Sequence, residues 1–505
     1  MSEHGAHCID ARAASPRWFN SFERRVVASL GLGALLLLAG CAAGPNYQAP
    51  AITLDPSFVN AGATTSNSAT PGSDIARFWR DFNDPMLSQL IERSIAVNGD
   101  VRIARARLQE ARAQLQGAQA ELLPEVDVRA GVSHGLQPQY LIPGTVRSER
   151  TSTIYDAGFL ANWELDFFGR NQRAAESAAA ELDASQAGVR AALTSVAAEV
   201  ARNYLELRGL QERQQVAQDS IVNQRDSLRL TEARLDSGRG TRFDVARART
   251  LLNTTEASLP ALQAAIDRTA YRLATLTAQP PRQLAAWVAQ SPGTLPSLPV
   301  TDLGALPIGT PEQLLGRRPD LVQAERQLAA ATANIGVATA DLFPRVNLVG
   351  LLGLAGVHLG SLGNGSSQQY SLGAALTWPL LDFGRVRSRI GASEARAQAA
   401  LANYEQTVRV ALEETEGALT TFTRNAQQSE SLSSAAASAE DASSLARMRF
   451  DAGSVDFLVV LDAQRQVLAA RDQLVQAQVG QATALVGIYR ALGGGWSEAD
   501  VRAGP

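Results

Sequence analysis

The chain has 505 residues, of which 6% are aromatic and 19% charged, and its formal net charge at pH 7 is −4. A charge this small for the length implies no strong electrostatic attraction to nucleic acid or to an anionic surface. Long stretches rich in Ala, Gln, Leu, Glu and Arg are typical of exposed helices or coiled coils rather than of several enzyme domains.

The first forty residues have the pattern of an export signal that ends at a lipid-attachment cysteine. Arg24 and Arg25 precede an apolar run, Val26 to Leu38, which is too short for a typical membrane span. Leu38, at the end of this run, begins the motif Leu-Ala-Gly-Cys, which ends at Cys41 and resembles a bacterial lipobox. We therefore expect a signal peptide over residues 1–40, a covalent lipid on Cys41 and no other cofactor. Ala42, rather than Asp, after the cysteine is typical of lipoproteins sorted to the outer membrane. The alternative is an ordinary signal peptide with a chance cysteine.

The rest of the chain contains an internal repeat, which is visible as a fixed offset between matching motifs. Motifs around Asp100 and Asp320 match at an offset of 220 residues, and so do two later prolines. Phe-Gly-Arg and Asp-X-Gly motifs further along match at an offset of 215 residues. Matched landmarks in the same order predict a duplication. They are Pro124, Gly169, Arg170 and Gly238 in the first copy and Pro344, Gly384, Arg385 and Gly453 in the second.

Each copy changes from helical to strand periodicity after its proline. Apolar side chains alternate with polar ones over about ten residues, bounded by Pro and Gly, which is the signature of a β-strand. Strands are predicted at about residues 125–134 and 153–168 in the first copy and 345–357 and 370–383 in the second. Aromatic side chains lie towards the ends of the apolar faces, as in the girdle of a membrane barrel; they are Tyr155, Trp163, Phe167, Tyr370 and Trp378.

Strands of this length can cross a bilayer, which needs about 9–11 tilted residues. Four strands cannot close a membrane barrel, since the smallest barrels have about eight and an open edge does not survive in hydrocarbon. The chain is therefore expected to contribute a sheet to a barrel shared between copies, with twelve strands for three chains or sixteen for four. The alternative is a four-stranded soluble sheet packed on helices.

Long helices are predicted after each pair of strands. The first copy has an apolar stripe at mostly three- and four-residue spacing from Asn171 to Asp236, and then a second helix from Thr241 to Thr277. The second copy repeats this plan with Val386 to Phe450 and Val455 to Leu492. At about 1.5 Å per residue, the first helix would be roughly 100 Å long. Helices that are polar over most of their girth suit a thin wall with water on both sides rather than a solid bundle.

The remaining segments complete the predicted organisation. Thr310 followed by Pro311 is a typical helix start, with Thr as the cap and Pro at the first position. The expected parts are a lipid-anchored lead and equatorial segment (41–85), a first repeat (86–279), an equatorial linker (280–311), a second repeat (312–492) and a C-terminal tail (493–505).

Four motifs together give the chain a family resemblance. They are Cys41-Ala42-Ala43-Gly44-Pro45-Asn46-Tyr47, Phe78-Trp79-Arg80-Asp81-Phe82-Asn83-Asp84-Pro85, Arg317-Arg318-Pro319-Asp320-Leu321 and Leu381-Asp382-Phe383-Gly384-Arg385. With them the chain resembles the TolC-like outer-membrane factor family, in particular its lipoprotein branch. The resemblance implies an α+β membrane protein in the outer membrane: a homotrimer with a twelve-stranded β-barrel, four strands per chain, continued by a long α-helical periplasmic tunnel. It also implies two partners, a periplasmic adaptor protein and an inner-membrane pump, which we expect to be a proton-driven transporter.

The resemblance also assigns a constriction. In that family, rings of side chains in the helix after the second glycine break keep the resting channel shut. By position, Leu458 corresponds to an apolar ring and Asp462 to an acidic ring. Three symmetry-related carboxylates at a narrow pore would favour cations. Some relatives have a further acid where this chain has Val459, which argues against a double acidic ring here. The alternative role for Asp462 is stabilisation of a helix N-terminus.

The sequence contains no motif of a zinc protease, a serine hydrolase or a phosphate-binding loop. His134 and His358 lie near the outer ends of the first and third predicted strands, and a pair of loop histidines seldom binds a metal. We therefore expect that the chain is not an enzyme. We expect it to be the passive exit duct of a tripartite efflux pump for drugs or other small solutes. The alternatives are an exit duct for type I protein secretion and a non-conducting structural lipoprotein that spans the periplasm.

Overall fold

The computed structural model describes residues 42–60, 75–290 and 293–502. The predicted signal peptide and Cys41 lie outside the described residues. The described residues belong to two units. The sheet unit consists of residues 42–46, 117–176 and 332–394, and the helical unit of residues 47–116, 177–331 and 395–502.

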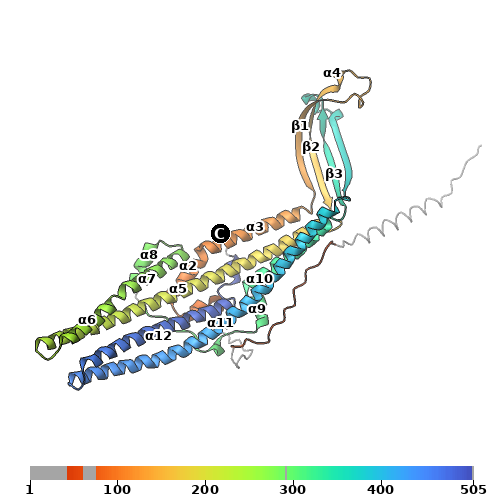
Figure 1. Cartoon of the computed structure of the whole chain (residues 1–505). Helices are drawn as coiled ribbons and strands as arrows, with labels where there is room; N and C mark the ends of the chain where they lie inside the picture. The colour runs from red at the N-terminus through yellow and green to blue at the C-terminus, as the bar shows by residue number, and fades with distance from the viewer. Residues whose placement is uncertain (1–41, 61–74, 291–292, 503–505) are drawn as a thin grey trace, which may run out of the picture. The chain divides into compact units, whose positions relative to one another are not determined.

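One antiparallel sheet of four strands, in the order β1-β2-β3-β4, forms the centre of the sheet unit (Figure 1). Pro124 and Pro344 directly precede β1 and β3, where a residue without an N–H is tolerated at the start of a strand. β1 and β4 are the outer strands, so among the described residues each pairs with only one strand. The bounds are β1 Glu125–Leu136, β2 Thr151–Leu165, β3 Arg345–Gly356 and β4 Gln368–Thr377.

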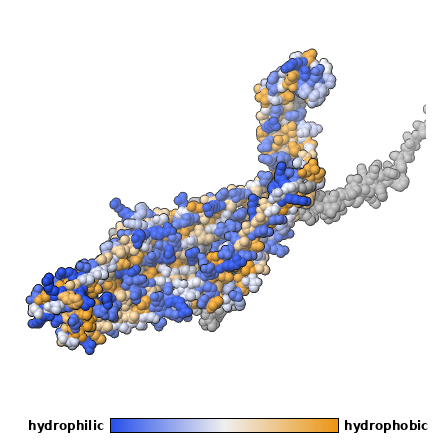
Figure 2. Space-filling model, in the orientation of Figure 1, coloured by the Kyte–Doolittle hydropathy of each residue, from blue (hydrophilic) through white to orange (hydrophobic). Residues whose placement is uncertain are grey.

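The register places apolar side chains of all four strands on one face of the sheet. Phe159 of β2 lies opposite Val128 of β1 and Leu352 of β3, and Leu352 lies opposite Tyr370 of β4. These four side chains are exposed in the single chain. The strand surface in Figure 2 accordingly shows hydrophobic residues next to hydrophilic ones. The predicted alternation in four strands is confirmed.

Two strands end earlier than predicted. β2 ends at Leu165 instead of about residue 168, because the Asp166 carboxylate accepts a hydrogen bond from the Gln172 amide at 2.7 Å and turns the chain into the next helix. β4 ends at Thr377 instead of about residue 383, because Pro379 has no N–H to donate to a neighbouring strand.

Helices make up most of the remaining described residues (Figure 1). None of the described helices combines the length and the apolar character that crossing a membrane requires. The α-helices are α2 Pro85–Val97, α3 Gly99–Ala120, α4 Arg147–Arg150, α5 Arg170–Asp236, α6 Arg242–Glu256, α7 Leu259–Leu276, α8 Pro281–Gln290, α9 Pro311–Arg317, α10 Pro319–Ala340, α11 Phe383–Asp451, α12 Phe457–Ala491 and α13 Glu498–Arg502. The 3-10 helices are η1 Ile75–Phe82, η2 Leu303–Ala305, η3 Leu359–Ser361 and η4 Gly365–Ser367.

The helix predicted from Thr241 to Thr277 is wrong as a single element. It is divided into α6 and α7, because Pro260 lacks an N–H and its ring would clash with the carbonyl of Glu256 in a continuous helix. The predicted equatorial linker contains α8, and the predicted lead and equatorial segment contains η1. The start of α9 is confirmed, since the Thr310 hydroxyl accepts a hydrogen bond from the Gln313 amide at 3.4 Å.

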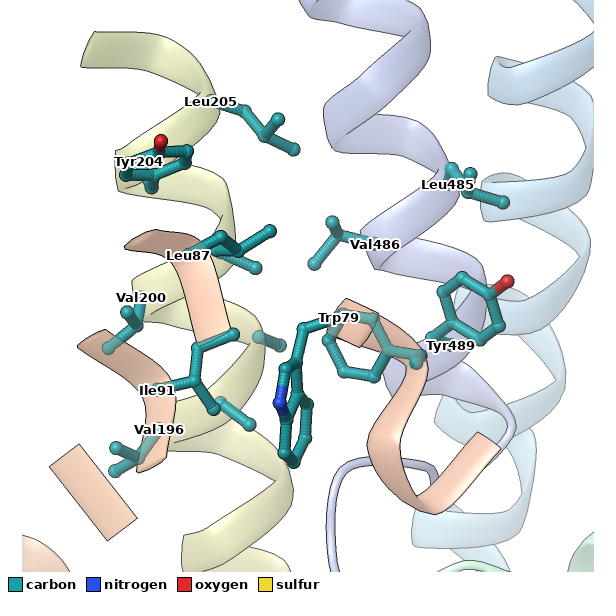
Figure 3. Packing of buried hydrophobic residues seen from close by; sticks show 14 of the residues in the cluster. Trp79, Leu87, Ile91, Val196, Val200, Tyr204, Leu205, Leu485, Val486 and Tyr489 are labelled. Atoms are coloured by element: carbon teal, nitrogen blue, oxygen red, sulfur yellow. The ribbon is translucent and has the colours of Figure 1, made fainter. Parts of the chain in front are cut away.

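The main core of the helical unit lies where η1 and α2 meet α5 and α12. Figure 3 shows Leu87 and Ile91 of α2 beside Val196 and Val200 of α5, with Trp79 of η1 in the same cluster. All five side chains are buried. Each contributes roughly 1.5–3 kcal/mol relative to an exposed position. This core fixes the four elements to one another.

Candidate functional site

The tips of two helical hairpins, α5–α6 and α11–α12, are built on the same turn (Figure 1). Gly238 and Gly453 each adopt a φ of +72°, a left-handed conformation that glycine reaches without a steric clash. After each glycine, the next amide donates to the carbonyl of the residue five positions earlier, at 2.9 Å. This glycine motif ends a helix and satisfies its last carbonyls. The two predicted glycine landmarks therefore have the same structural role.

An apolar cluster, here called the tip cluster, joins the two hairpins of one chain. The Phe450 and Phe457 rings lie 5.1 Å apart, and the Arg234 guanidinium lies 4.3 Å above Phe450. A cation over an aromatic face adds attraction to the packing. The cluster consists of Ala248, Ala446, Phe450, Phe457, Val460, Leu461 and Ala463.

Leu458 and Asp462 lie together on the face of α12 opposite to the face that packs in the tip cluster. Val460 and Leu461 are buried in the tip cluster, whereas Leu458 is 44% exposed and Val459 46% exposed. Residues four apart share one face of a helix, so Leu458 and Asp462 form one surface. The structure thus brings the two predicted constriction residues onto a single exposed strip at the hairpin tip.

The Asp462 carboxylate has two partners on its own helix. One oxygen accepts from Arg465 Nη2 at 2.5 Å, and the other accepts from Gln466 Nε2 at 2.8 Å. The cap of α12 is Asp456, whose carboxylate accepts from the Leu458 amide at 2.9 Å. Because the helix dipole acts mainly within the first turn, Asp462 in the second turn gains little from it. The alternative role for Asp462 as an N-terminal stabiliser therefore loses its basis.

Polar contacts hold α12 against α5 beyond the tip cluster. Gln464 Nε2 donates to Ser227 Oγ at 2.9 Å. Arg213 donates to both oxygens of Asp472, at 2.7 and 3.2 Å. A two-point pair of this kind fixes orientation as well as distance. The strip with Leu458 and Asp462 is therefore presented by a helix that is fixed against α5.

The first hairpin has an equivalent strip, which the sequence interpretation missed. The offset of 215 residues takes Leu458 to Phe243 and Asp462 to Arg247. Phe243 is 63% exposed, and the Arg247 guanidinium lies 5.0 Å from its ring. The offset itself was the signal that could have identified them. The two hairpin tips thus present opposite charges at equivalent positions.

The other landmarks lie at the turns between strands and helices. Gly169 has a φ of +73° between β2 and α5, and Arg170 Nε lies 3.2 Å from Glu164 Oε1. In the second copy, Arg385 lies 3.1 Å from Asp382. A Cβ added to Gly169 would lie 2.8 Å from Ala42 Cβ, whereas one added to Gly384 would meet no atom of the described residues within 4 Å. Among the described residues, the first turn is therefore packed and the second is open.

Residues 42–46, here called the N-terminal strap, pack against the first turn. The Ala43 amide donates to the Phe168 carbonyl at 3.0 Å. The buried Arg173 donates to the Ala43 carbonyl at 3.2 Å and to Asn46 Oδ1 at 2.6 Å. A Cβ on Gly336 would lie 2.7 Å from the Ala43 carbonyl oxygen. The strap therefore needs this glycine in order to fit.

In the helical unit, Arg318 connects three helices. Its guanidinium donates to Asp320 at 2.7 Å, to Glu414 at 2.7 Å and to the Ala491 carbonyl at 3.3 Å. Burial lowers the pKa of Arg318, but the hydrogen bonds and charges of Asp320 and Glu414 outweigh it and make the net shift upward. Arg318 is therefore a charged structural contact between α10, α11 and α12.

His134 and His358 lie on exposed parts of the sheet unit. His134 Nδ1 is 2.9 Å from Thr153 Oγ1, and His358 precedes η3. Across the described residues, no group of three or more His, Cys, Asp or Glu side chains has an arrangement that could hold a metal ion.

The comparisons with known proteins agree with one another. A family model described as "Outer membrane efflux protein" matches residues 90–279 and 310–494. The pyoverdine export outer membrane protein OpmQ of Pseudomonas aeruginosa is 33% identical over 476 residues, which cover 92% of this chain and 96% of that protein. The solvent efflux pump outer membrane protein SrpC of Pseudomonas putida is 30% identical over 473 residues, covering 93% and 98%. The solved outer-membrane channel OprN has a TM-score of 0.82 and 40% identity, covering 90% of this chain and all of that chain.

Proposed function

Because this chain belongs to the outer membrane efflux protein family, we propose that three copies of it form one exit duct in the outer membrane. The chain itself is an outer-membrane efflux channel protein. The finer proposal is a homotrimer with a twelve-stranded barrel continued by a helical periplasmic tunnel, built from a duplicated unit. Solutes would pass through it without chemical change.

The observation that carries this proposal is the four-stranded sheet, whose two edges are unpaired in the part of the chain that the structure describes. Val128, Phe159, Leu352 and Tyr370 present exposed apolar side chains on one of its faces. Four strands are too few to close a barrel, and the barrels of the outer membrane leave no free edge in lipid. Association with further copies satisfies both edges and covers no part of the apolar face, which then meets lipid.

The proposed partners are a periplasmic adaptor protein and an inner-membrane pump, which supply the driving force that a passive duct lacks. The proposed cargo is a small solute. Two similar proteins are named for pyoverdine export and for solvent efflux, which favours small solutes over the protein-secretion alternative.

The proposed constriction is formed by Leu458 and Asp462 at the tip of α11–α12. Both lie on one exposed strip, and α12 is fixed against α5, so that three strips related by symmetry could form an apolar ring and an acidic ring. The proposed lipid on Cys41 would attach directly before the N-terminal strap, which packs against the turn after β2.

The mass of the detergent-solubilised protein tests this proposal. Wild type should have three times the mass of one chain. A Cys41→Ala variant exported with a non-lipid signal should give the same mass, because the shared barrel rather than the lipid holds the copies together. A monomeric wild-type protein in several mild detergents would contradict the proposal. Loss of assembly in the variant alone would show that the lipid, not the barrel, drives association.

A further inference from the structure

A pocket of about 570 Å³ lies in the helical unit, between the segment around η2 and the helices α11 and α12. Phe422 and Ala426, four residues apart on α11, line it from one helix face. Leu303 of η2 and Gln481 of α12 belong to the same lining. The volume is in the range of sites for small molecules, about 300–1,000 Å³. Conduction through a duct gives this pocket no role.

The repeat identifies Gln481 as an unusual residue in this lining. Adding 215 turns buried positions of α7 into buried positions of α12: Ile266, Ala270 and Leu273 become Gln481, Leu485 and Ile488. Gln481 is 7% exposed, and its side chain makes no hydrogen bond with any described residue. Burying an amide without a hydrogen bond costs free energy, which the isoleucine of the first copy avoids. An amide that lines a pocket at such a position points to a bound polar group.

Two carboxylates give the pocket a negative charge. Asp302 and Glu430 line it, neither forms an ion pair with a described residue, and the described lining contains no lysine or arginine. The Gly304 amide donates to Asp302 Oδ1 at 3.3 Å, which leaves the other oxygen available. Unpaired carboxylates favour a cation. Across the described residues, no group of three or more His, Cys, Asp or Glu side chains could hold a metal ion, so the expected cation is organic.

The corresponding place in the first copy is filled by the chain itself. The offset takes Gln427 of the pocket lining to Glu212. The Glu212 carboxylate accepts from the Leu295 amide at 3.2 Å, and the neighbouring Gln211 donates to the Val288 carbonyl at 3.2 Å. Backbone groups of α8 and of the linker after it therefore satisfy the polar side chains of the first copy. The second copy instead has an open pocket with a polar lining.

We propose that this pocket binds a small organic ammonium ion, one per chain. The ammonium group donates to the carboxylates of Asp302 and Glu430 and to the amide oxygen of Gln481, and its apolar body packs against Leu303 and Phe422. A primary ammonium has three N–H donors and no acceptor, which matches these three acceptor groups. The site lies within one chain, so it goes beyond the exit duct and does not depend on the number of copies.

Equilibrium dialysis of the full-length protein, with the same detergent in both chambers, measures this binding. The probes are benzylammonium, neutral benzyl alcohol and anionic benzoate, which share one aromatic body and differ in charge. We expect saturable binding of benzylammonium alone, with one site per chain and a dissociation constant of about 1 mM or lower.

A double variant removes the two charges of the pocket. Asp302→Asn together with Glu430→Gln keeps the size of both side chains and should weaken the binding of benzylammonium at least tenfold, which is about 1.4 kcal/mol. The matched control, Glu405→Gln together with Asp441→Asn, removes two carboxylates from exposed positions of α11. The control should bind benzylammonium as the wild type does, because its charges lie outside the pocket lining.

Gln481→Ile introduces the residue of the first copy and separates a role in binding from a role in folding. It should weaken the binding of benzylammonium at least threefold and leave the melting temperature of the free protein unchanged or higher. Unchanged affinity in this variant or in the double variant would overturn the site. So would an equal loss of affinity in the control, equal binding of benzyl alcohol, or no saturable binding at all. If a variant fails to fold, the three probes compared on the wild type still decide between binding and no binding.

Discussion

Asp462→Asn removes one negative charge per chain and leaves the size of the side chain almost unchanged. In the single chain, the Asp462 and Arg465 side chains are 43% and 70% exposed, and they are three residues apart on one helix. Exposed pairs of this kind contribute about 0.2–0.5 kcal/mol to stability. The substitution should therefore lower the melting temperature by less than about two degrees, since 1 kcal/mol corresponds to a few degrees in a chain of this size.

The expected effect on conduction is larger than the effect on stability. If three carboxylates meet at a narrow pore, two of them about 8 Å apart repel by roughly 2 kcal/mol at an effective dielectric constant of about 20. The same field attracts a passing cation, and a change of about 1.4 kcal/mol in the free energy of the cation at the constriction alters its occupancy there tenfold. We expect Asp462→Asn to lower the preference for potassium over chloride at least threefold.

Reversal potentials of purified protein in planar bilayers, under a potassium chloride gradient, measure this preference. The matched control is Asp451→Asn, which removes the same charge from the same hairpin and also loses an arginine partner, Arg447, at 3.4 Å. An unchanged reversal potential in Asp462→Asn, or an equal shift in Asp451→Asn, would refute the assignment of Asp462 to the constriction.

Three further predictions concern the rest of the chain. Arg318→Leu should lower the free energy of unfolding by about 1.5–3 kcal/mol, because it removes the buried guanidinium that donates to Asp320, to Glu414 and to the Ala491 carbonyl; a thermal shift no larger than that of an exposed arginine variant would contradict this. Gly336→Val should displace the N-terminal strap from its site and expose it to protease, whereas unchanged protection would show that the strap does not depend on this close approach. Burial raises the pKa of the Tyr204 and Tyr489 phenols, the second to about 12. Above pH 10 the unfolded phenols lose their protons before the folded ones, so stability should fall by up to roughly 1.4 kcal/mol per pH unit for each phenol; a flat midpoint between pH 9 and 12, compared with the Tyr204→Phe variant, would refute it.

The strands could be predicted from the sequence because their alternation is regular on both sides of each turn. Their ends could not, since Asp166 ends β2 through a hydrogen bond to a residue six positions later. The break between α6 and α7 was predictable from Pro260, but the apolar spacing on either side suggested one helix. Helix α8 was hidden in a segment rich in Pro and Gly, whose composition favours a loop.

The candidate site, too, was only partly predictable from the sequence. The resemblance to a family pointed to Leu458 and Asp462, and the structure places both on one exposed strip. The partners of Asp462, Arg465 and Gln466, follow from helix geometry once the helix start is known. No sequence motif marks Phe243. It is identified only by comparing equivalent positions of the two hairpins, where it is an exposed counterpart of Leu458.

The most direct test of the exit duct is single-channel recording of the purified, trimeric wild-type protein in planar bilayers. The account predicts discrete conductance steps that favour cations. Stable trimers of both the wild type and an Asp462→Ala variant that insert into the bilayer but never conduct, under any voltage or salt gradient, would contradict it.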